Sequence, residues 1–256
     1  MTELTTTSRL EALTFDLDDT LWDNAGVMRR TEQGHFGWLS DSLAAWLAER
    51  GEAQPNRFAE RVTLEHYLAR RQAMAKRYPL RRGDFTWIRE QALVSLLSDI
   101  GLPASAAWLW AGAAMSRFHA LRLEVSPYPE VEPLLAELAQ RYRLASITNG
   151  NLAFDRLALR RHFRVAIAAG EMHAPKPDAR PFLAALARLG TSPSRALHVG
   201  DSWNEDILPA VRLGMRAAWI APQADPDSAL PSGVTRLGHV SELPGLLAAI
   251  EGNDSR

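Results

Sequence analysis

Carboxylates gather within one short stretch near the start of the chain. TFDLDDTLWDN, residues 14–24, holds four acidic residues in eleven positions, directly after an apolar segment. Like charges this close raise one another's pKa and destabilise a fold unless a cation lies among them. The stretch therefore predicts a site that binds a metal ion or a positive side chain.

Two of these acids have the spacing that phosphoryl transfer needs. A carboxylate at Asp16 can attack phosphorus in line and form an aspartyl phosphate, which divides one difficult hydrolysis into two easier steps. Asp18 can then protonate the leaving oxygen and later deprotonate the attacking water. Mg²⁺ prefers oxygen ligands, so the carboxylates of Asp16 and Asp201 with the backbone carbonyl of Asp18 would hold it beside a phosphate.

Several residues further along the chain are suited to binding the phosphate itself. Phosphoryl transfer spreads negative charge over the equatorial oxygens, so hydrogen-bond donors and cations aimed at them stabilise the reaction. The hydroxyl of Thr148 and the backbone amides of Asn149 and Gly150 are candidate donors, and Lys176 is the candidate cation. We therefore expect Thr148 and Lys176 to be catalytic as well as phosphate-binding residues.

Short apolar runs rich in β-branched residues are predicted to be the strands that position these side chains. They are residues 12–17, 143–148, 164–169, 195–200 and 215–221. Runs that are continuous rather than alternating indicate strands buried on both faces of a parallel sheet. Helical patterns at 131–142, 180–190 and 205–214 lie between them, and the last two end in Gly, as helices often do.

The alternation of strands and helices predicts a doubly wound, Rossmann-like α/β fold with a parallel sheet. Ligands of such folds bind at the carboxyl ends of the strands. The candidate residues follow the first four predicted strands in turn: Asp16 and Asp18; Thr148, Asn149 and Gly150; Lys176; Asp201 and Asp206. We expect them to converge on one edge of the sheet.

Residues 24–125 interrupt this alternation. Helical patterns at 36–51, 57–78 and 87–101 follow one another there without a buried-strand run. We therefore predict a catalytic core formed by residues 1–23 and 126–256, with an all-helical domain of residues 24–125 inserted after the first strand.

Composition argues against several classes of protein. The net charge is −1, from 29 basic and 30 acidic residues, which gives no electrostatic basis for binding nucleic acid or an anionic membrane. Cysteine is absent, which excludes disulfides and thiolate chemistry. The N-terminal residues lack a signal-peptide pattern, and no window approaches the roughly 20 apolar residues of a membrane span. We expect a cytoplasmic monomer or homodimer.

Four segments together carry a family resemblance. They are DLDDT (16–20), TNG (148–150), KPD (176–178) and GDSWNED (200–206). In this order they resemble the four motifs of the haloacid dehalogenase superfamily. The resemblance implies that the helical insert is a C1-type cap, that Mg²⁺ is the cofactor, and that Asp206 orients Lys176 or a metal-bound water.

The branches of this superfamily differ at identifiable positions. Its dehalogenases lack an acid two residues after the nucleophile, whereas this chain has Asp18. Its phosphomutases usually read DxDG, whereas Thr20 follows Asp19 here. Its transporting ATPases have transmembrane stretches. We therefore expect a Mg²⁺-dependent phosphatase that hydrolyses a small phosphomonoester.

A narrower resemblance suggests the substrate. FDLDDTLWDN (15–24), RRTE (29–32), SITNGN (146–151) and residues 196–220 resemble the bacterial flavin mononucleotide phosphatases, which also dephosphorylate the ribitylaminouracil phosphate of riboflavin synthesis. Phosphoglycolate, sugar phosphates and other nucleotides remain alternatives. A non-catalytic phosphate-binding protein, or a phospho-acceptor module that accumulates the aspartyl phosphate, is the alternative from a different class.

Overall fold

The chain forms two compact units. The computed structural model describes residues 9–51, 62–168, 170, 172–223 and 229–254. One unit, here called the core unit, comprises Met1–Asp23, Ser126–Gly150 and Phe154–Arg256. The other, here called the helical unit, comprises Asn24–Val125 together with Asn151–Ala153. Residues 151–153 were expected in the core, but they group with the helices.

The core unit is built on a parallel sheet. Its strands, in chain order, are β1 Ala12–Phe15, β2 Arg143–Thr148, β3 Val165–Ala168, β4 Ala196–Gly200, β5 Arg216–Ile220 and β6 Val234–Leu237. Among the described residues they form one sheet in the order β3-β2-β1-β4-β5-β6, with every neighbouring pair parallel. The chain winds one way from β1 to β3 and the other way from β4 to β6, so the topology switches between β1 and β4. The predicted doubly wound fold is confirmed.

The strand predictions were accurate in the centre of the sheet and weaker at its edge. All of β1 and β4 is buried, as the continuous apolar runs indicated. β6 was not predicted because its sequence, VTRL, mixes polar and apolar residues, and as an edge strand it is only partly buried. Ala169, the last residue of the predicted third strand, lies outside the described residues.

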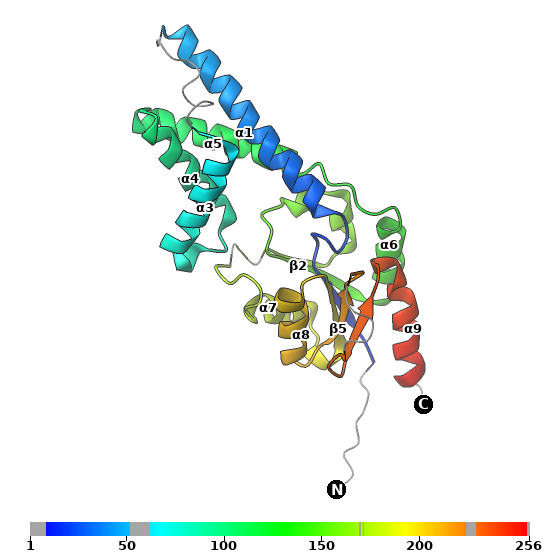
Figure 1. Ribbon diagram of the computed structural model, residues 1–256. Helices are drawn as coiled ribbons and strands as arrows, with labels where there is room; N and C mark the ends of the chain where they lie inside the picture. The colour runs from blue at the N-terminus through cyan, green and yellow to red at the C-terminus, as the bar shows by residue number, and fades with distance from the viewer. Residues whose placement is uncertain (1–8, 52–61, 169, 171, 224–228, 255–256) are drawn as a thin grey trace. The chain divides into compact units, whose positions relative to one another are not determined.

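Helices cover both faces of the sheet. They are α6 Val131–Arg141, α7 Arg180–Leu189, α8 Leu208–Arg212 and α9 Leu243–Asp254. In Figure 1, α7 and α8 lie on one side of the sheet and α6 and α9 on the other. α7 ends at Gly190, whose φ of 65° is the left-handed conformation that glycine adopts most easily. The helix predicted at 205–214 is instead a wide, π-type turn at Trp203–Ile207 followed by α8.

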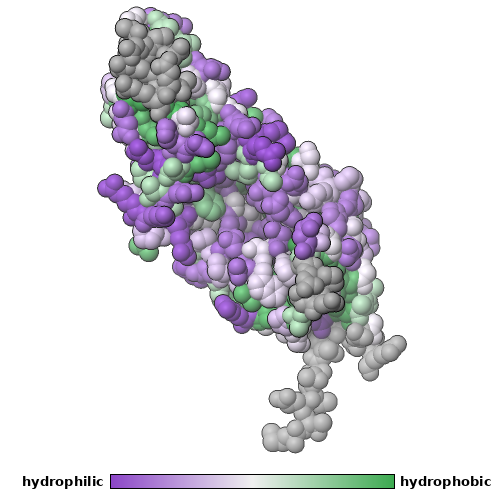
Figure 2. Space-filling model, in the orientation of Figure 1, coloured by the Kyte–Doolittle hydropathy of each residue, from purple (hydrophilic) through white to green (hydrophobic). Residues whose placement is uncertain are grey.

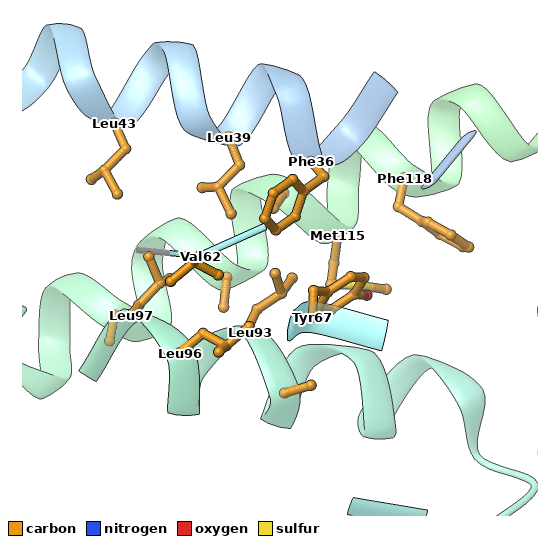
Figure 3. Close-up of a cluster of buried hydrophobic side chains, with 14 of the residues drawn as sticks. Phe36, Leu39, Leu43, Val62, Tyr67, Leu93, Leu96, Leu97, Met115 and Phe118 are labelled. Carbon is orange, nitrogen blue, oxygen red and sulfur yellow. The ribbon is translucent and has the colours of Figure 1, made fainter. Parts of the chain in front are cut away.

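The helical unit contains four described helices around a hydrophobic core. They are α1 Asn24–Glu49, α3 Leu64–Arg77, α4 Phe85–Asp99 and α5 Ala104–Arg122. α1 begins twelve residues before the predicted helix because its first turns are polar and give no amphipathic signal. Leu39, Leu43, Leu93 and Phe118 are fully buried where the helices meet (Figure 3). Residues 57–61 of the predicted second helix lie outside the described residues.

One face of the molecule is mostly hydrophilic. On the face shown in Figure 2, hydrophilic residues cover most of the visible area and hydrophobic residues form smaller patches. Trp38, Trp46 and Trp110 pack against the core of the helical unit, whereas Trp108 is 46% exposed. Among the described helices, none is both long enough and apolar enough to cross a bilayer.

A charged cluster lies inside the helical unit. Glu32, within the RRTE segment, accepts hydrogen bonds from Arg71 at 2.5 Å and from Arg89 at 3.2 Å, both on Oε1. Glu32 and Arg89 are 8% and 4% exposed. Because a buried guanidinium is costly without a carboxylate, Glu32 holds α1, α3 and α4 together.

We predict that Glu32→Gln destabilises the helical unit. Removing one partner of a buried ion pair leaves the other charge uncompensated, so the free energy of unfolding should fall by about 3 kcal/mol. Urea unfolding followed by tryptophan fluorescence measures the change. Glu49→Gln, at the exposed end of the same helix, is the matched control and should unfold like the wild type. Equal stability of the two variants would contradict the role given to Glu32.

Candidate active site

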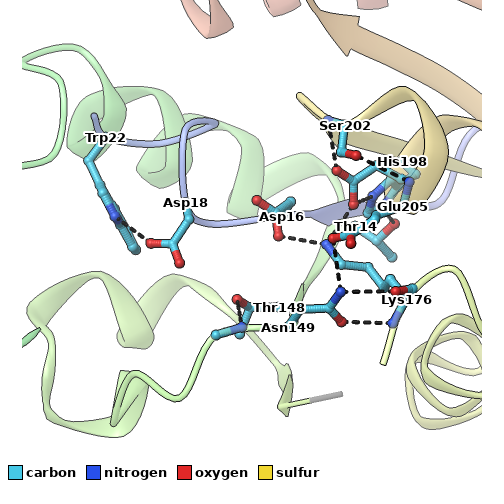
Figure 4. Close-up of polar contacts among 12 residues, drawn as sticks. Thr14, Asp16, Asp18, Trp22, Thr148, Asn149, Lys176, His198, Ser202 and Glu205 are labelled. Atoms are coloured by element: carbon cyan, nitrogen blue, oxygen red, sulfur yellow. Dashed lines mark hydrogen bonds and ion pairs between the residues drawn. The ribbon is translucent and has the colours of Figure 1, made fainter. Parts of the chain in front are cut away.

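The first strand delivers Asp16 to the switch point of the sheet. Asp16 follows β1 directly, and its amide donates to the carbonyl of Val199 in β4 at 2.8 Å. Its carboxylate Oδ1 accepts a hydrogen bond from Lys176 Nζ at 2.6 Å (Figure 4). Asp16 is 6% exposed and Lys176 is 3% exposed, so this pair is largely shielded from water.

Asp206 supplies the second carboxylate to Lys176. Lys176 Nζ donates to Asp206 Oδ1 at 2.5 Å, and the amide of Ser202 donates to Oδ2 at 3.1 Å. Burial alone would raise the pKa of Asp206, but Lys176 and His198 lower it to about 2. Burial alone would lower the pKa of Lys176, but the charges of Asp16 and Asp206 raise it above its ordinary value. Both groups are therefore ionised, and Asp206 fixes the position of Lys176.

A buried histidine extends this arrangement into the sheet. His198 Nε2 lies 3.2 Å from Asp206 Oδ1, and His198 Nδ1 lies 2.8 Å from the hydroxyl of Thr14. A carboxylate only accepts, so Nε2 carries the proton and Nδ1 accepts from Thr14. Burial lowers the pKa of His198, which agrees with a neutral ring. Thr14, His198 and Asp206 thus form a hydrogen-bonded chain that ends at Lys176.

Gly200 makes room for this chain. A Cβ atom at Gly200 would lie 2.5 Å from Asp206 Cγ and 2.7 Å from Oδ2. Asp206 is held on both oxygens, so it cannot move away without losing Lys176 or Ser202. The glycine is required by this close approach rather than by its φ angle.

We predict that Gly200→Ala impairs both stability and catalysis. Overpacking at this position should cost about 1–3 kcal/mol of unfolding free energy. Displacement of Asp206 would release Lys176 and lower turnover by about tenfold or more. Gly112→Ala is the control, because a Cβ at Gly112 meets no atom within 4 Å. Urea unfolding and steady-state turnover of both variants test this, and a Gly200→Ala enzyme that matched its control would refute it.

The carboxylates at this edge fit a divalent cation. One oxygen each from Asp16, Asp201 and Asp206 lies within 4.8 Å of the others. Three carboxylates against the single ammonium of Lys176 leave two negative charges in excess, which a divalent cation would neutralise. Burial and the neighbouring charges of Asp206 and Asp19 raise the pKa of Asp201 to about 6. Burial also raises the pKa of Asp16 well above 3.8, and Lys176 opposes this only in part.

Asp18 lies apart from the Lys176 pairs. Its carboxylate Oδ1 accepts a hydrogen bond from Trp22 Nε1 at 2.9 Å, and Figure 4 shows it beside Trp22. Trp22 is fully buried, whereas Asp18 is half-buried. Leu21 N donates to Leu17 O at 2.9 Å and closes the turn between them. The negative charge of Asp18 contributes to the raised pKa of Asp16, which places the two carboxylates in one electrostatic neighbourhood.

The residues after β2 are bonded to one another and to the Lys176 loop. The amide of Gly150 donates to Thr148 Oγ1 at 3.0 Å. Asn149 Oδ1 accepts from the amide of Lys176 at 2.7 Å, and its Nδ2 donates to the carbonyl of Lys176 at 3.0 Å. Nδ2 also donates to Glu205 Oε2 at 2.9 Å. The side chain of Asn149 therefore positions Lys176, in addition to the backbone role predicted from sequence.

The structure brings most of the candidate residues to one edge and adds others. Asp16, Asp201, Asp206 and Lys176 meet there, while the carboxylate of Asp18 is held by Trp22. The residues that sequence reasoning missed are Thr14, Trp22, His198, Ser202 and Glu205. A histidine within the apolar strand ALHVG was the available signal, because a buried imidazole needs polar partners.

The family of this chain is shown by comparison with known proteins. The haloacid dehalogenase-like hydrolase family model matches residues 10–214, which is most of the chain. The chain belongs to this family. The expected superfamily and the expectation of a hydrolase are confirmed.

Individual relatives carry more specific names. The chain is 32% identical to the 5-amino-6-(5-phospho-D-ribitylamino)uracil phosphatase YigB of Escherichia coli, over 84% of this chain and 85% of that protein. It is 29% identical to a phosphoserine phosphatase of Thermus thermophilus, over 91% and 98% of the two chains. A solved structure described as a 2-haloacid dehalogenase from Pseudomonas syringae is 34% identical, with a TM-score of 0.79, and covers 94% of this chain and 99% of its own.

Proposed function

We propose that this protein is a Mg²⁺-dependent phosphatase that hydrolyses a small phosphomonoester through an aspartyl phosphate on Asp16. The observation that carries the proposal is the buried contact of Asp16 with Lys176 at the switch point, among carboxylates that leave two negative charges in excess. The phosphatases among the relatives support the same reaction class.

Asp16 is the proposed nucleophile. Lys176 donates a hydrogen bond to Oδ1. No described residue donates a hydrogen bond to Oδ2, so Oδ2 is the oxygen that attacks. A bond forms between Oδ2 and phosphorus while the bond from phosphorus to the leaving oxygen breaks. Lys176 stays in contact with the carboxylate and lowers the repulsion between it and the anionic phosphate.

Asp18 is the proposed acid and base. It donates a proton to the leaving oxygen in the first half-reaction, and in the second it takes a proton from the water that attacks the aspartyl phosphate. The hydrogen bond from Trp22 fixes the carboxylate of Asp18 for both transfers. Thr148, Asn149, Gly150 and Lys176 are the proposed phosphate-binding residues, with the Thr148 hydroxyl free to turn its proton toward a phosphate oxygen.

Mg²⁺ fits the oxygen ligands at this edge. We propose that the carboxylates of Asp16 and Asp201 and the backbone carbonyl of Asp18 hold it. Asp206 does not bind the ion in this proposal; it positions Lys176, which in turn contacts Asp16. When bound, it would supply the positive charge that lets a carboxylate and a phosphate lie side by side.

Chelation gives a test of this cofactor. We predict that EDTA lowers turnover of p-nitrophenyl phosphate by about a hundredfold, because several kcal/mol of charge stabilisation would be lost. Excess Mg²⁺ should restore the rate, while the same ionic strength of NaCl should not. A rate unaffected by thorough chelation would contradict a metal-dependent mechanism.

Carbon–halogen cleavage is the second candidate, because one similar structure is described as a 2-haloacid dehalogenase. A halide ion leaves without a proton, so carbon–halogen cleavage does not need a general acid at Asp18. The buried indole that holds Asp18 favours phosphate ester hydrolysis instead, where the leaving alkoxide must be protonated. Chloride release from 2-chloropropionate at a rate comparable to phosphate release from p-nitrophenyl phosphate would reverse this assignment.

The helical unit is the proposed cap that selects the substrate. The similarity to YigB supports the ribitylaminouracil phosphate as substrate, and flavin mononucleotide is the related candidate. Phosphoserine is favoured by the second relative. A screen of metabolite phosphates that also includes phosphoglycolate and sugar phosphates, ranked by kcat/KM, decides among these substrates. Tight binding without turnover of any ester would favour the non-catalytic alternative.

A further inference from the structure

A cavity lies at the amino ends of the strands, whereas the candidate active site lies at their carboxyl ends. It measures about 670 Å³. Its lining includes Glu11 before β1, Arg143 at the start of β2, Arg164 before β3 and Arg195 before β4. In a parallel sheet the amino ends of all strands lie on one side, and the carboxyl ends, where Asp16 lies, are on the opposite side. Catalysis at the carboxyl edge therefore gives no reason for this cavity.

Positive charge is concentrated around this cavity. Five arginines line it: Arg9, Arg141, Arg143, Arg164 and Arg195. Glu11 and Glu251 are the acidic residues of the lining, which leaves three positive charges in excess. The whole chain has a net charge of −1, so this concentration is local and does not reflect a generally basic surface.

Three of the arginines are already occupied in holding the fold. Glu11 forms ion pairs with Arg143 and Arg195. Arg143 also donates to the carbonyl of Leu189 at 2.6 Å, at the end of α7. Arg141 donates to the two carboxylate oxygens of Glu251 at 2.8 and 2.6 Å, which joins α6 to α9. These contacts use both acids of the cavity.

Arg9 and Arg164 are left for another partner. The charge of Arg9 helps to lower the pKa of Glu251, but among the described residues neither Arg9 nor Arg164 has a side-chain hydrogen bond, and both are exposed at the cavity. Arg9 precedes β1, and Arg164 precedes β3. A guanidinium binds phosphate through two parallel hydrogen bonds, which makes arginine the usual residue for recognising phosphate groups.

We propose that this cavity binds a small phosphorylated molecule carrying two or three negative charges, with Arg9 and Arg164 as its first contacts. The cavity volume lies within the range of small-molecule sites, about 300–1,000 Å³. The bound anion would neutralise the excess positive charge. It would also join the segments that precede β1 and β3, next to α6 and α9. This site is independent of the proposed phosphatase reaction.

Calorimetry with inorganic pyrophosphate tests the proposal. Titrations are made in Mg²⁺-free buffer on the wild type and on Arg9→Ser/Arg164→Ser. We expect the double variant to bind at least about tenfold more weakly, because two guanidinium groups that would form charge-assisted hydrogen bonds with the anion are lost. The thermal midpoint should rise with pyrophosphate in the wild type and much less in the double variant.

Two further variants separate this site from other sources of binding. Arg188→Ser/Arg212→Ser removes the same charge from exposed positions of the core unit outside the cavity and should bind as the wild type does. Lys176→Met removes the cation of the active site and should also retain binding. Equal weakening in the two double variants would mean an adventitious ion only, and loss of binding in Lys176→Met would place it at the active site. Either result overturns the proposal, as does unchanged binding in Arg9→Ser/Arg164→Ser. If Lys176→Met does not fold, the comparison of the two double variants decides alone.

Discussion

Asp16→Asn is expected to lose turnover of p-nitrophenyl phosphate by about 10⁴-fold or more, the scale of loss that follows removal of a covalent nucleophile. An amide oxygen is a far weaker nucleophile than a carboxylate, and it carries no charge to pair with Lys176 or a divalent cation. Asn has nearly the same shape as Asp, so Lys176 keeps an oxygen partner and the fold is retained. Phosphate release under saturating Mg²⁺ measures the effect.

Asp19→Asn is the matched control for this experiment. Asp19 is exposed and has a φ of 58°, a left-handed conformation that Asn tolerates better than most residues. The variant removes one carboxylate from the same loop without touching the proposed nucleophile, and it should keep most of the activity. A fully active Asp16→Asn enzyme would remove Asp16 from the mechanism, and equal losses in both variants would point to loop charge rather than nucleophilic attack.

Asp18→Asn is expected to lower steady-state turnover by about 10³-fold, within the range that general acid–base catalysis contributes. Phosphorylation of Asp16 should slow because the leaving oxygen is no longer protonated. Breakdown of the aspartyl phosphate should slow further because water is no longer deprotonated. Rapid-quench measurement of phosphate and p-nitrophenol release follows the two half-reactions separately.

Trp22→Phe shows whether the hydrogen bond to Asp18 matters. The substitution keeps a buried aromatic ring but removes the Nε1–H donor. Turnover should fall by about tenfold, less than in Asp18→Asn, because the carboxylate remains but is less well fixed. An Asp18→Asn enzyme as active as the wild type would exclude Asp18 as acid and base, whatever the effect of Trp22→Phe.

Much of the site could be predicted because its residues follow buried strands. Asp16, Thr148 and Asp201 come immediately after β1, at the end of β2 and immediately after β4. Hydrophobic runs locate parallel strands well, and the carboxyl ends of such strands share one edge of the sheet. The convergence of these residues therefore follows from local pattern and topology alone.

The supporting contacts could not be predicted in this way. The bond between Asn149 and Glu205 joins residues 56 apart in sequence, and that between Thr14 and His198 joins residues 184 apart. Neither spacing has a local signature, since each depends on which strands are neighbours and how far each loop extends. The same holds for Gly200, whose need for a missing Cβ arises from Asp206 on the following turn.

The buried polar residues of the helical unit could not be predicted from hydrophobic periodicity. α1 begins in a polar segment whose Glu32 and His35 are nevertheless buried. Glu32 is bonded to Arg71 and Arg89, whereas His35 Nδ1 lies 2.9 Å from the carbonyl oxygen of Thr31 in its own helix. Periodicity reports which residues are apolar, and it does not identify polar residues that find partners inside a core.

The most direct test of the account is the mass of Asp18→Asn after brief incubation with Mg²⁺ and a turned-over phosphomonoester. If Asp16 is the nucleophile and Asp18 the base for hydrolysis, the intact protein should gain the mass of one phosphoryl group. Proteolysis should then locate that group on the peptide that contains Asp16. An Asp18→Asn protein that still hydrolyses the ester but never carries a phosphoryl group, or carries it on another peptide, would contradict the proposed mechanism.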